Sequence, residues 1–159
     1  MHLSFYKPHY FAAVNNYHLT EEQLRFTGTP NDAILKSNEG SDRYPILAVE
    51  EEKLVTFFVL HRREGVKPYS NNNCAILIRA FSTDSHEQGK GYATKSLKLL
   101  PAFIMEHFLD INEIVLAVNV KNTAAQALYE KCGYIDEGVR VMGSKGELIV
   151  MSYHFRGEI

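Results

Sequence analysis

Gln88-Gly89-Lys90-Gly91-Tyr92-Ala93 opens a stretch in which apolar residues recur at helical spacing. The two glycines let the backbone curl so that several amide N–H groups point the same way. The partial positive charge of a helix N-terminus lies at the same place and favours an anion. We therefore predict a phosphate-binding loop over residues 88–93, with a plain tight turn as the simpler alternative.

Two common nucleotide-binding motifs do not fit this loop. A Walker A loop needs Gly-Lys followed by Ser or Thr, whereas Lys90 is followed by Gly91. The Rossmann fingerprint needs a third glycine at the position of Thr94. The loop is therefore expected to bind its anion in another structural context.

A second block, residues 122–134, has the pattern N-x-x-A-x-x-L-Y-x-K-x-G-Y. Together the two blocks closely resemble the GNAT superfamily of acetyl-CoA-dependent N-acetyltransferases, specifically from about Cys74 to Tyr153. The resemblance implies a mixed α+β (α/β) GNAT fold, in which about four to five helices flank a central mixed sheet of roughly six to seven strands. It also implies that one parallel pair of strands splays apart at its C-terminal end.

The resemblance implies site residues and a cosubstrate, acetyl-CoA. The first block holds the coenzyme A pyrophosphate and comprises Gln88, Gly89, Lys90, Gly91, Tyr92 and Ala93. The strand before it, around Phe81, Ser82 and Thr83, supplies a backbone N–H for the oxyanion. The second block places Asn122 near the coenzyme arm and Tyr129 opposite the sulfur, as the acid that protonates the leaving thiolate.

Three of these residues also have simpler interpretations. The Lys90 side chain could point to solvent, as most lysines do. Asn122 suits the N-cap of a helix, and it could serve both as cap and as ligand. Tyr129 could be a packing aromatic, although the resemblance favours the acid. No side chain is singled out as general base among Glu50, His61, Asp84, His86 and Glu87.

Composition bounds the class of protein. The chain has 159 residues, is 45% hydrophobic and carries a formal charge of −2, which suits one domain over residues 1–159 with an apolar core. There is no basic face for nucleic acid, no signal-peptide core and no run of roughly 18 apolar residues for a membrane span. We expect a cytoplasmic protein, monomeric or homodimeric, that binds neither nucleic acid nor membranes.

Cys74 and Cys132 form neither a disulfide framework nor a metal-binding pattern, so no metal is expected. Cys132 lies in the last turn of a helix that would approach the thioester. No histidine is placed in sequence to activate it, so we interpret it as a small packing residue and not as a nucleophile.

Periodicity and turn residues predict the order β-α-α-α-β-β-β-α-β-α-β-β. The first helix is expected over 8–17, and capping motifs at Thr20 and Thr29 begin two short helices. The remaining elements are strands at 44–49, 54–61, 74–83 and 113–118, helices at 93–108 (bent at Pro101) and 123–132, and a hairpin of 134–142 with 148–155.

The predicted activity is transfer of an acetyl group to a primary amine of a small molecule. A protein or peptide acetyltransferase and a non-catalytic acyl-CoA sensor are the alternatives. In the resembled family the acceptor site is built from the first helices and the terminal hairpin, here about Tyr10–Pro30 and Val141–Leu148. Glu21 and Glu22 among aromatic residues would suit a cationic amine.

Overall fold

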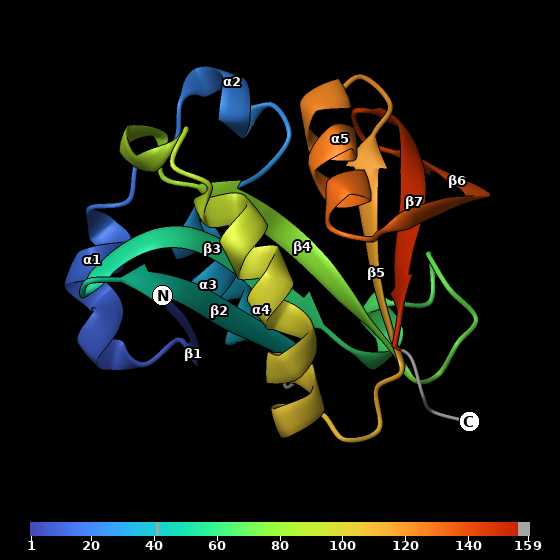
Figure 1. The fold of residues 1–159 in the computed structure, drawn as a ribbon, viewed down its shortest axis with the longest axis horizontal. Coiled ribbons are helices and arrows are strands. Elements are labelled where there is room, and N and C mark those ends of the chain that lie inside the picture. The colour runs from blue at the N-terminus through green and yellow to red at the C-terminus, as the bar shows by residue number, and fades with distance from the viewer. Residues whose placement is uncertain (41, 156–159) are drawn as a thin grey trace.

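The computed structural model describes residues 1–40 and 42–155, and its elements follow the predicted order (Figure 1). The strands are β1 (His2–Phe5), β2 (Arg43–Glu50), β3 (Lys53–His61), β4 (Ala75–Thr83), β5 (Glu113–Asn119), β6 (Ile135–Gly143) and β7 (Gly146–His154). The α-helices are α1 (Phe11–Asn15), α2 (Glu21–Leu24), α3 (Pro30–Ser37), α4 (Tyr92–His107) and α5 (Thr123–Lys131). Short 3₁₀ helices cover Pro8–Tyr10, Arg63–Gly65 and Ser85–Glu87.

The helix predicted over 8–17 is split, because a 3₁₀ turn at Pro8–Tyr10 precedes the short α1. Lys7, at the start of that turn, supplies no capping hydrogen bond, and proline occupies its first position. The two capping motifs are confirmed. The Thr20 side chain accepts a hydrogen bond from the Gln23 amide while the Gln23 side chain accepts one from the Thr20 amide, and Thr29 caps α3.

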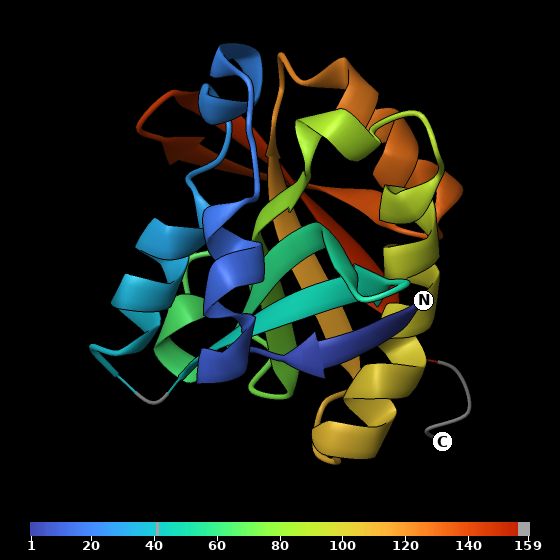
Figure 2. The ribbon, with the colours of Figure 1, turned by 90° about the vertical axis from the view of Figure 1, so that its left-hand side faces the viewer.

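Seven strands form one sheet in the order β1-β2-β3-β4-β5-β7-β6, and β4 with β5 is the parallel pair. Helices α4 and α5 cover one face of the sheet, and α1 and α3 cover the other (Figure 2). Among the described helices, none combines the length and the apolar character needed to cross a membrane.

The parallel pair opens into a wedge. Pairing between β4 and β5 runs from Ala75 opposite Glu113 to Ile78 opposite Leu116, and both strands continue beyond it. Two residues after Ile78, Ala80 has a φ of 56°, and the register between β3 and β4 shifts at this point. Such a bulge bends its strand, so β4 turns away from β5. The splay implied by the family resemblance is confirmed.

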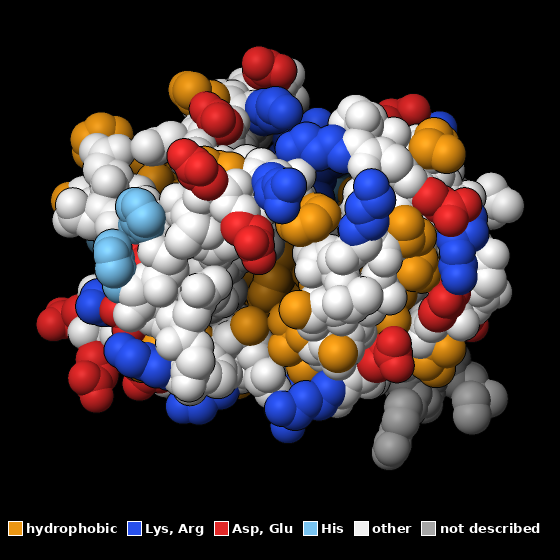
Figure 3. Space-filling model, turned by 90° about the horizontal axis from the view of Figure 1, so that it is seen from above, with side chains coloured by type: hydrophobic (Ala, Val, Ile, Leu, Met, Phe, Trp, Pro, Cys, Tyr) orange, Lys and Arg blue, Asp and Glu red, His pale blue; other side chains and the backbone are white. Residues whose placement is uncertain are grey.

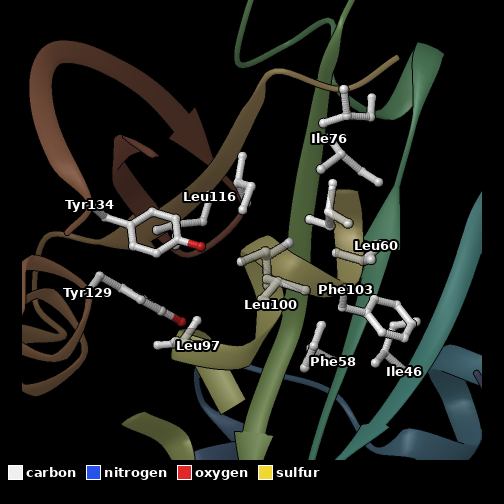
Figure 4. Packing of buried hydrophobic residues seen from close by; sticks show 14 of the residues in the cluster. Ile46, Phe58, Leu60, Ile76, Leu97, Leu100, Phe103, Leu116, Tyr129 and Tyr134 are labelled. Atoms are coloured by element: carbon white, nitrogen blue, oxygen red, sulfur yellow. The ribbon is translucent and has the colours of Figure 1, made fainter. Parts of the chain in front are cut away.

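The main core lies between α4 and the sheet (Figure 4). Leu97, Leu100 and Ile104 of α4 are at most 2% exposed and form the predicted apolar stripe. The helix runs unbroken through Pro101. This packing anchors α4 across the sheet and so fixes its N-terminus, where residues 88–93 lie, beside the open end of the wedge.

Candidate active site

The wedge opens into a cleft of about 1190 Å³ at the C-terminal ends of β4 and β5. Figure 3 shows it as a groove with an apolar floor across the top of the molecule. The cleft joins the loop before α4, the N-terminal part of α5, the segment from α2 to α3 and the turn between β6 and β7. Ten of the eleven predicted site residues line it: Phe81, Ser82, Thr83, Gln88, Gly89, Gly91, Tyr92, Ala93, Asn122 and Tyr129.

The loop at residues 88–93 is open toward the cleft. Gly89 and Gly91 have φ angles of 81° and 80°, in the left-handed region that favours glycine. A Cβ at either position would meet no atom within 4 Å. Gly91 is the N-cap of the 16-residue α4, and no side chain from the described part of the chain caps the helix there. The first amides of α4 therefore lack a side-chain acceptor and are suited to an anion.

Lys90 is the predicted site residue that does not line the cleft. Its ammonium lies 2.9 Å from the Glu87 carboxylate, which also binds Lys53 at 2.6 Å. Glu87 is 4% exposed, and hydrogen bonds from Lys53 and Lys90 hold the pKa of its carboxyl below the usual range. The Lys90 side chain is thus paired with Glu87 within the loop and is not directed at an anion in the cleft, while Lys53 joins the same carboxylate to β3.

Tyr129 of α5 is 8% exposed and has its ring edge-on to Phe81 at 6.0 Å and to Tyr134 at 5.9 Å. Figure 4 shows its hydroxyl pointing from α5 toward Leu97 of α4. Burial raises the pKa of the Tyr129 hydroxyl well above its usual value near 10. At neutral pH the hydroxyl is therefore protonated and can donate a proton, on a residue that lines the cleft.

Tyr134 is a neighbour that the sequence analysis assigned no role. Its side chain is 3% exposed, burial raises its pKa, and its hydroxyl has no hydrogen-bond partner among the described residues. Tyr134 is the last residue of the second sequence block, and this position was the sequence signal that could have identified it as part of the site. It packs beside Tyr129 but does not line the cleft.

Asn122 caps α5, because its side-chain oxygen accepts a hydrogen bond from the Ala125 amide at 3.2 Å. The residue also lines the cleft, so its position is compatible both with the helix N-cap and with a ligand of the coenzyme arm. Cys132 is partly buried at the end of α5, outside the cleft lining, and packs against the main core. Burial raises the pKa of its thiol, which opposes a role as nucleophile.

The segment after α1 and helix α2 are tied to the end of β4 by contacts that the sequence did not reveal. The Tyr17 hydroxyl donates to the Ser82 carbonyl at 2.7 Å, and the Gln23 side chain donates to the Thr83 carbonyl at 2.8 Å. These groups are 65 and 60 positions apart in the chain, so no local pattern links them. The contacts hold α2 beside the wedge.

Of the five side chains considered as general bases, Glu87 alone lines the cleft. Its carboxylate forms salt bridges with two lysines. Asp84 is 5% exposed and accepts hydrogen bonds from the amides of His18 and His86. His61 lies at the opposite end of β3, where it contacts Arg79. Asp32 of α3 is a further carboxylate that lines the cleft.

The acceptor end differs from the acidic entrance expected from the sequence. Glu22 lines the cleft but Glu21 does not, and two cations, Arg25 and Lys145, lie there as well. An adjoining hollow of about 520 Å³ is lined by Glu22, Arg25, Phe26, Asn119, Lys121 and Lys145. Lys and Arg side chains gather at one end of the groove in Figure 3.

Away from the cleft, Glu113, Glu137 and His154 bring three potential metal ligands within 4.8 Å of one another. The group lies where β5 begins and β7 ends, at the other end of the sheet from the wedge. The Glu113 carboxylate already accepts a hydrogen bond from Asn72 at 2.9 Å. These residues take no part in the chemistry of the cleft.

Comparisons with known proteins agree with this architecture. The acetyltransferase (GNAT) family model matches residues 11–134. The uncharacterized N-acetyltransferase YbbJ of Bacillus subtilis (strain 168) is 40% identical over 154 residues, which are 96% of this chain and 96% of the relative.

Two solved structures are similar at low sequence identity and so show the shared fold. AAC(6')-Ib in complex with ribostamycin and coenzyme A has a TM-score of 0.77 at 16% identity, covering 99% of this chain and 98% of that one. Spermidine N-acetyltransferase from Vibrio cholerae, in complex with CoA and spermine, has a TM-score of 0.68 at 16% identity, covering 96% and 94%. The extent of the family match and the identity to the Bacillus relative show that the chain belongs to the acetyltransferase (GNAT) family and is an N-acetyltransferase.

Proposed function

We propose that this chain, acting as one domain over residues 1–159, transfers the acetyl group of acetyl-CoA to the primary amine of a small molecule. One observation carries the proposal. A single cleft joins an open phosphate loop, a splayed strand pair with a buried tyrosine, and an acceptor end framed by α2 and the β6–β7 turn. Similar structures that contain coenzyme A with ribostamycin or with spermine support a thioester donor and an amine acceptor.

The donor fits residues of the cleft on physical grounds. The pyrophosphate would lie on the amides around Gly89 and Gly91, where a side chain would fill the open space. The amide-bearing arm would enter the wedge beyond Ile78 and Leu116, where β4 and β5 no longer pair. Unpaired main-chain groups need partners, and the arm supplies them.

The groups in the cleft, together with water, account for every bond and proton that changes in the acetyl transfer. The neutral amine attacks the thioester carbonyl carbon, so that a C–N bond forms and the C–S bond breaks. A main-chain N–H around Phe81–Thr83 would stabilise the oxyanion, and Tyr129 would give its proton to the departing sulfur. The proton lost by the amine passes to water, and Tyr129 regains one from solvent. The products are an amide and a free thiol.

A small acceptor is favoured over a peptide by a contact across the acceptor end. The Lys145 ammonium donates to the Arg25 carbonyl at 2.8 Å and so links the β6–β7 turn to the end of α2. A peptide substrate would need an open groove at this place. The buried Tyr129 beside the wedge favours an enzyme over a sensor, which would need the phosphate loop but no acid.

Thiol release from acetyl-CoA, measured against a panel of small amines, peptides and water, tests the proposal. We expect release that depends on a small amine and saturates with it. Release that requires a peptide would point to the protein acetyltransferase. Tight acetyl-CoA binding without amine-dependent release would point to the sensor.

A further inference from the structure

Three cations surround the hollow that adjoins the acceptor end of the cleft. Arg25 follows α2, Lys121 lies between β5 and α5, and Lys145 lies in the β6–β7 turn. Glu22 is the one carboxylate among the described residues that line this hollow. The hollow therefore has a local excess of positive charge in a chain whose formal charge is −2.

Hydrogen bonds to a buried side chain fix the main chain of two of these residues, Lys121 and Lys145. Asn119 is 8% exposed; its amide nitrogen donates to the Lys145 carbonyl at 3.0 Å, and its oxygen accepts from the Lys121 amide at 2.9 Å. The Lys145 ammonium in turn donates to the Arg25 carbonyl. One connected network thus joins three segments that are far apart in the sequence.

The three cations lack the acidic partners that six other cations of the chain have. Lys53, Arg62, Arg63, Lys67, Lys90 and Arg140 each form a salt bridge to a carboxylate. Within residues 1–40 and 42–155, no salt bridge joins Arg25, Lys121 or Lys145 to a carboxylate. Three cations face one carboxylate, Glu22, around the hollow, so the uncompensated positive charge is suited to an anionic ligand.

We propose that the acceptor is an amine that also carries an acidic group, a carboxylate or a phosphate, and that Arg25, Lys121 and Lys145 bind this group while the amine reaches the wedge beside Tyr129. The inference rests on the proposed function and narrows its acceptor. Guanidinium and ammonium groups both form charge-assisted hydrogen bonds to such oxyanions. A polycation without an acidic group would be repelled by the same three side chains.

Matched acceptor pairs test this inference. The kcat/KM for thiol release should be compared for tyrosine and tyramine, lysine and cadaverine, and phosphoethanolamine and ethanolamine, with spermidine as the polycation. We expect the acidic member of at least one pair to be favoured by about tenfold or more, with a preference that weakens as salt rises. A preferred amino acid identifies a carboxylate ligand, and preferred phosphoethanolamine identifies a phosphate.

Reversing the charge of cations around the hollow then tests whether the hollow causes the preference for the acidic acceptor. R25E combined with K121E should remove most of the preference, while the acetyl-CoA KM stays within about threefold. K67E is the control, because Lys67 is exposed and does not line the cleft or the hollow, and it should keep the wild-type preference. Three results would each overturn the inference and leave the proposed function intact. They are equal kcat/KM values for the two members of every pair, a preference for spermidine, and a preference for the acidic member that survives R25E/K121E.

If no amine supports thiol release, the proposed function fails, and the anion site is tested by binding. Inorganic phosphate should be titrated into the protein saturated with CoA, which occupies the phosphate loop. Calorimetric binding to the wild type and to K67E, with loss in R25E/K121E, supports the anion site. Equal binding by all three proteins, or none by the wild type, overturns it.

Discussion

Gly91 and Tyr129 have roles at the level of single residues that can be tested separately. Gly91 combines a left-handed backbone with open space in front of its α-carbon, so any side chain there would enter the proposed phosphate site. Tyr129 is buried and lines the cleft, so it is proposed to be a donor in the transition state. The first role concerns donor binding and the second concerns the chemical step.

Gly91→Glu should abolish acetyl-CoA binding measured by calorimetry, because its side chain blocks and repels the phosphates. Gly138→Glu is the matched control. Gly138 also has a left-handed φ, of 94°, and open space in front of it, but it lies on β6 outside the cleft. The control carries the same backbone strain and should bind acetyl-CoA like the wild type. Unchanged affinity in Gly91→Glu would refute the pyrophosphate assignment.

Tyr129→Phe should lower kcat by about 10²-fold or more with little change in the KM for acetyl-CoA, since the hydroxyl acts chiefly in the transition state. Tyr134→Phe is the control. It removes a buried hydroxyl that has no hydrogen-bond partner among the described residues, so kcat should stay near wild type and the free energy of unfolding should stay equal or rise by about 1 kcal/mol. A Tyr129→Phe kcat within about threefold of wild type would make Tyr129 a packing residue.

At the scale of elements, the sequence predicted the order and type of every strand and α-helix, because capping motifs and apolar periodicity are local signals. It did not predict the bulge at Ala80, since alanine carries no local signal for a φ of 56°. It also missed the basic hollow, because Arg25, Lys121 and Lys145 come together only when α2, β5 and the terminal hairpin are packed. The sequence left the Lys90 side chain either at the anion or in solvent, and it did not reveal the ion pair with Glu87 that the fold provides.

Glu87 links β3 to the loop before α4, and Glu87→Gln tests this link. The variant loses the charge that binds Lys53 and Lys90, so we expect the acetyl-CoA KM to rise several-fold with little change in kcat. Glu64→Gln, in an exposed pair with Lys67, is the control and should change neither constant. An unchanged KM in Glu87→Gln would show that the loop holds its conformation without this link.

The pKa of Glu87 gives this link a pH dependence. Because the folded pKa lies below its ordinary value, the contribution of Glu87 to stability is fully present above that value. It is lost as the pH falls through the folded pKa. The link should therefore be intact at neutral pH.

At the scale of the whole molecule, His61 predicts how stability responds to acid. Burial, with Arg43 and Arg79 nearby, lowers the pKa of His61 to about 4 from its ordinary value of 6.5. Between these values the unfolded chain binds a proton that the folded chain does not, so stability falls as the pH drops from about 6.5 to 4. His61→Gln should flatten this part of the curve in denaturant unfolding, whereas the exposed His9→Gln should not. Parallel curves for wild type and His61→Gln would contradict the prediction.

The whole account depends on acetyl transfer to nitrogen within this cleft, and the stoichiometry of the reaction tests it most directly. The wild-type protein should be incubated with acetyl-CoA and its best amine, with released thiol and N-acetylated amine quantified together by absorbance and mass spectrometry. The account predicts one N-acetylated amine for each thiol, with both products lost together in Gly91→Glu. Thiol release without an N-acetylated product, or equal yields from Gly91→Glu, would contradict it.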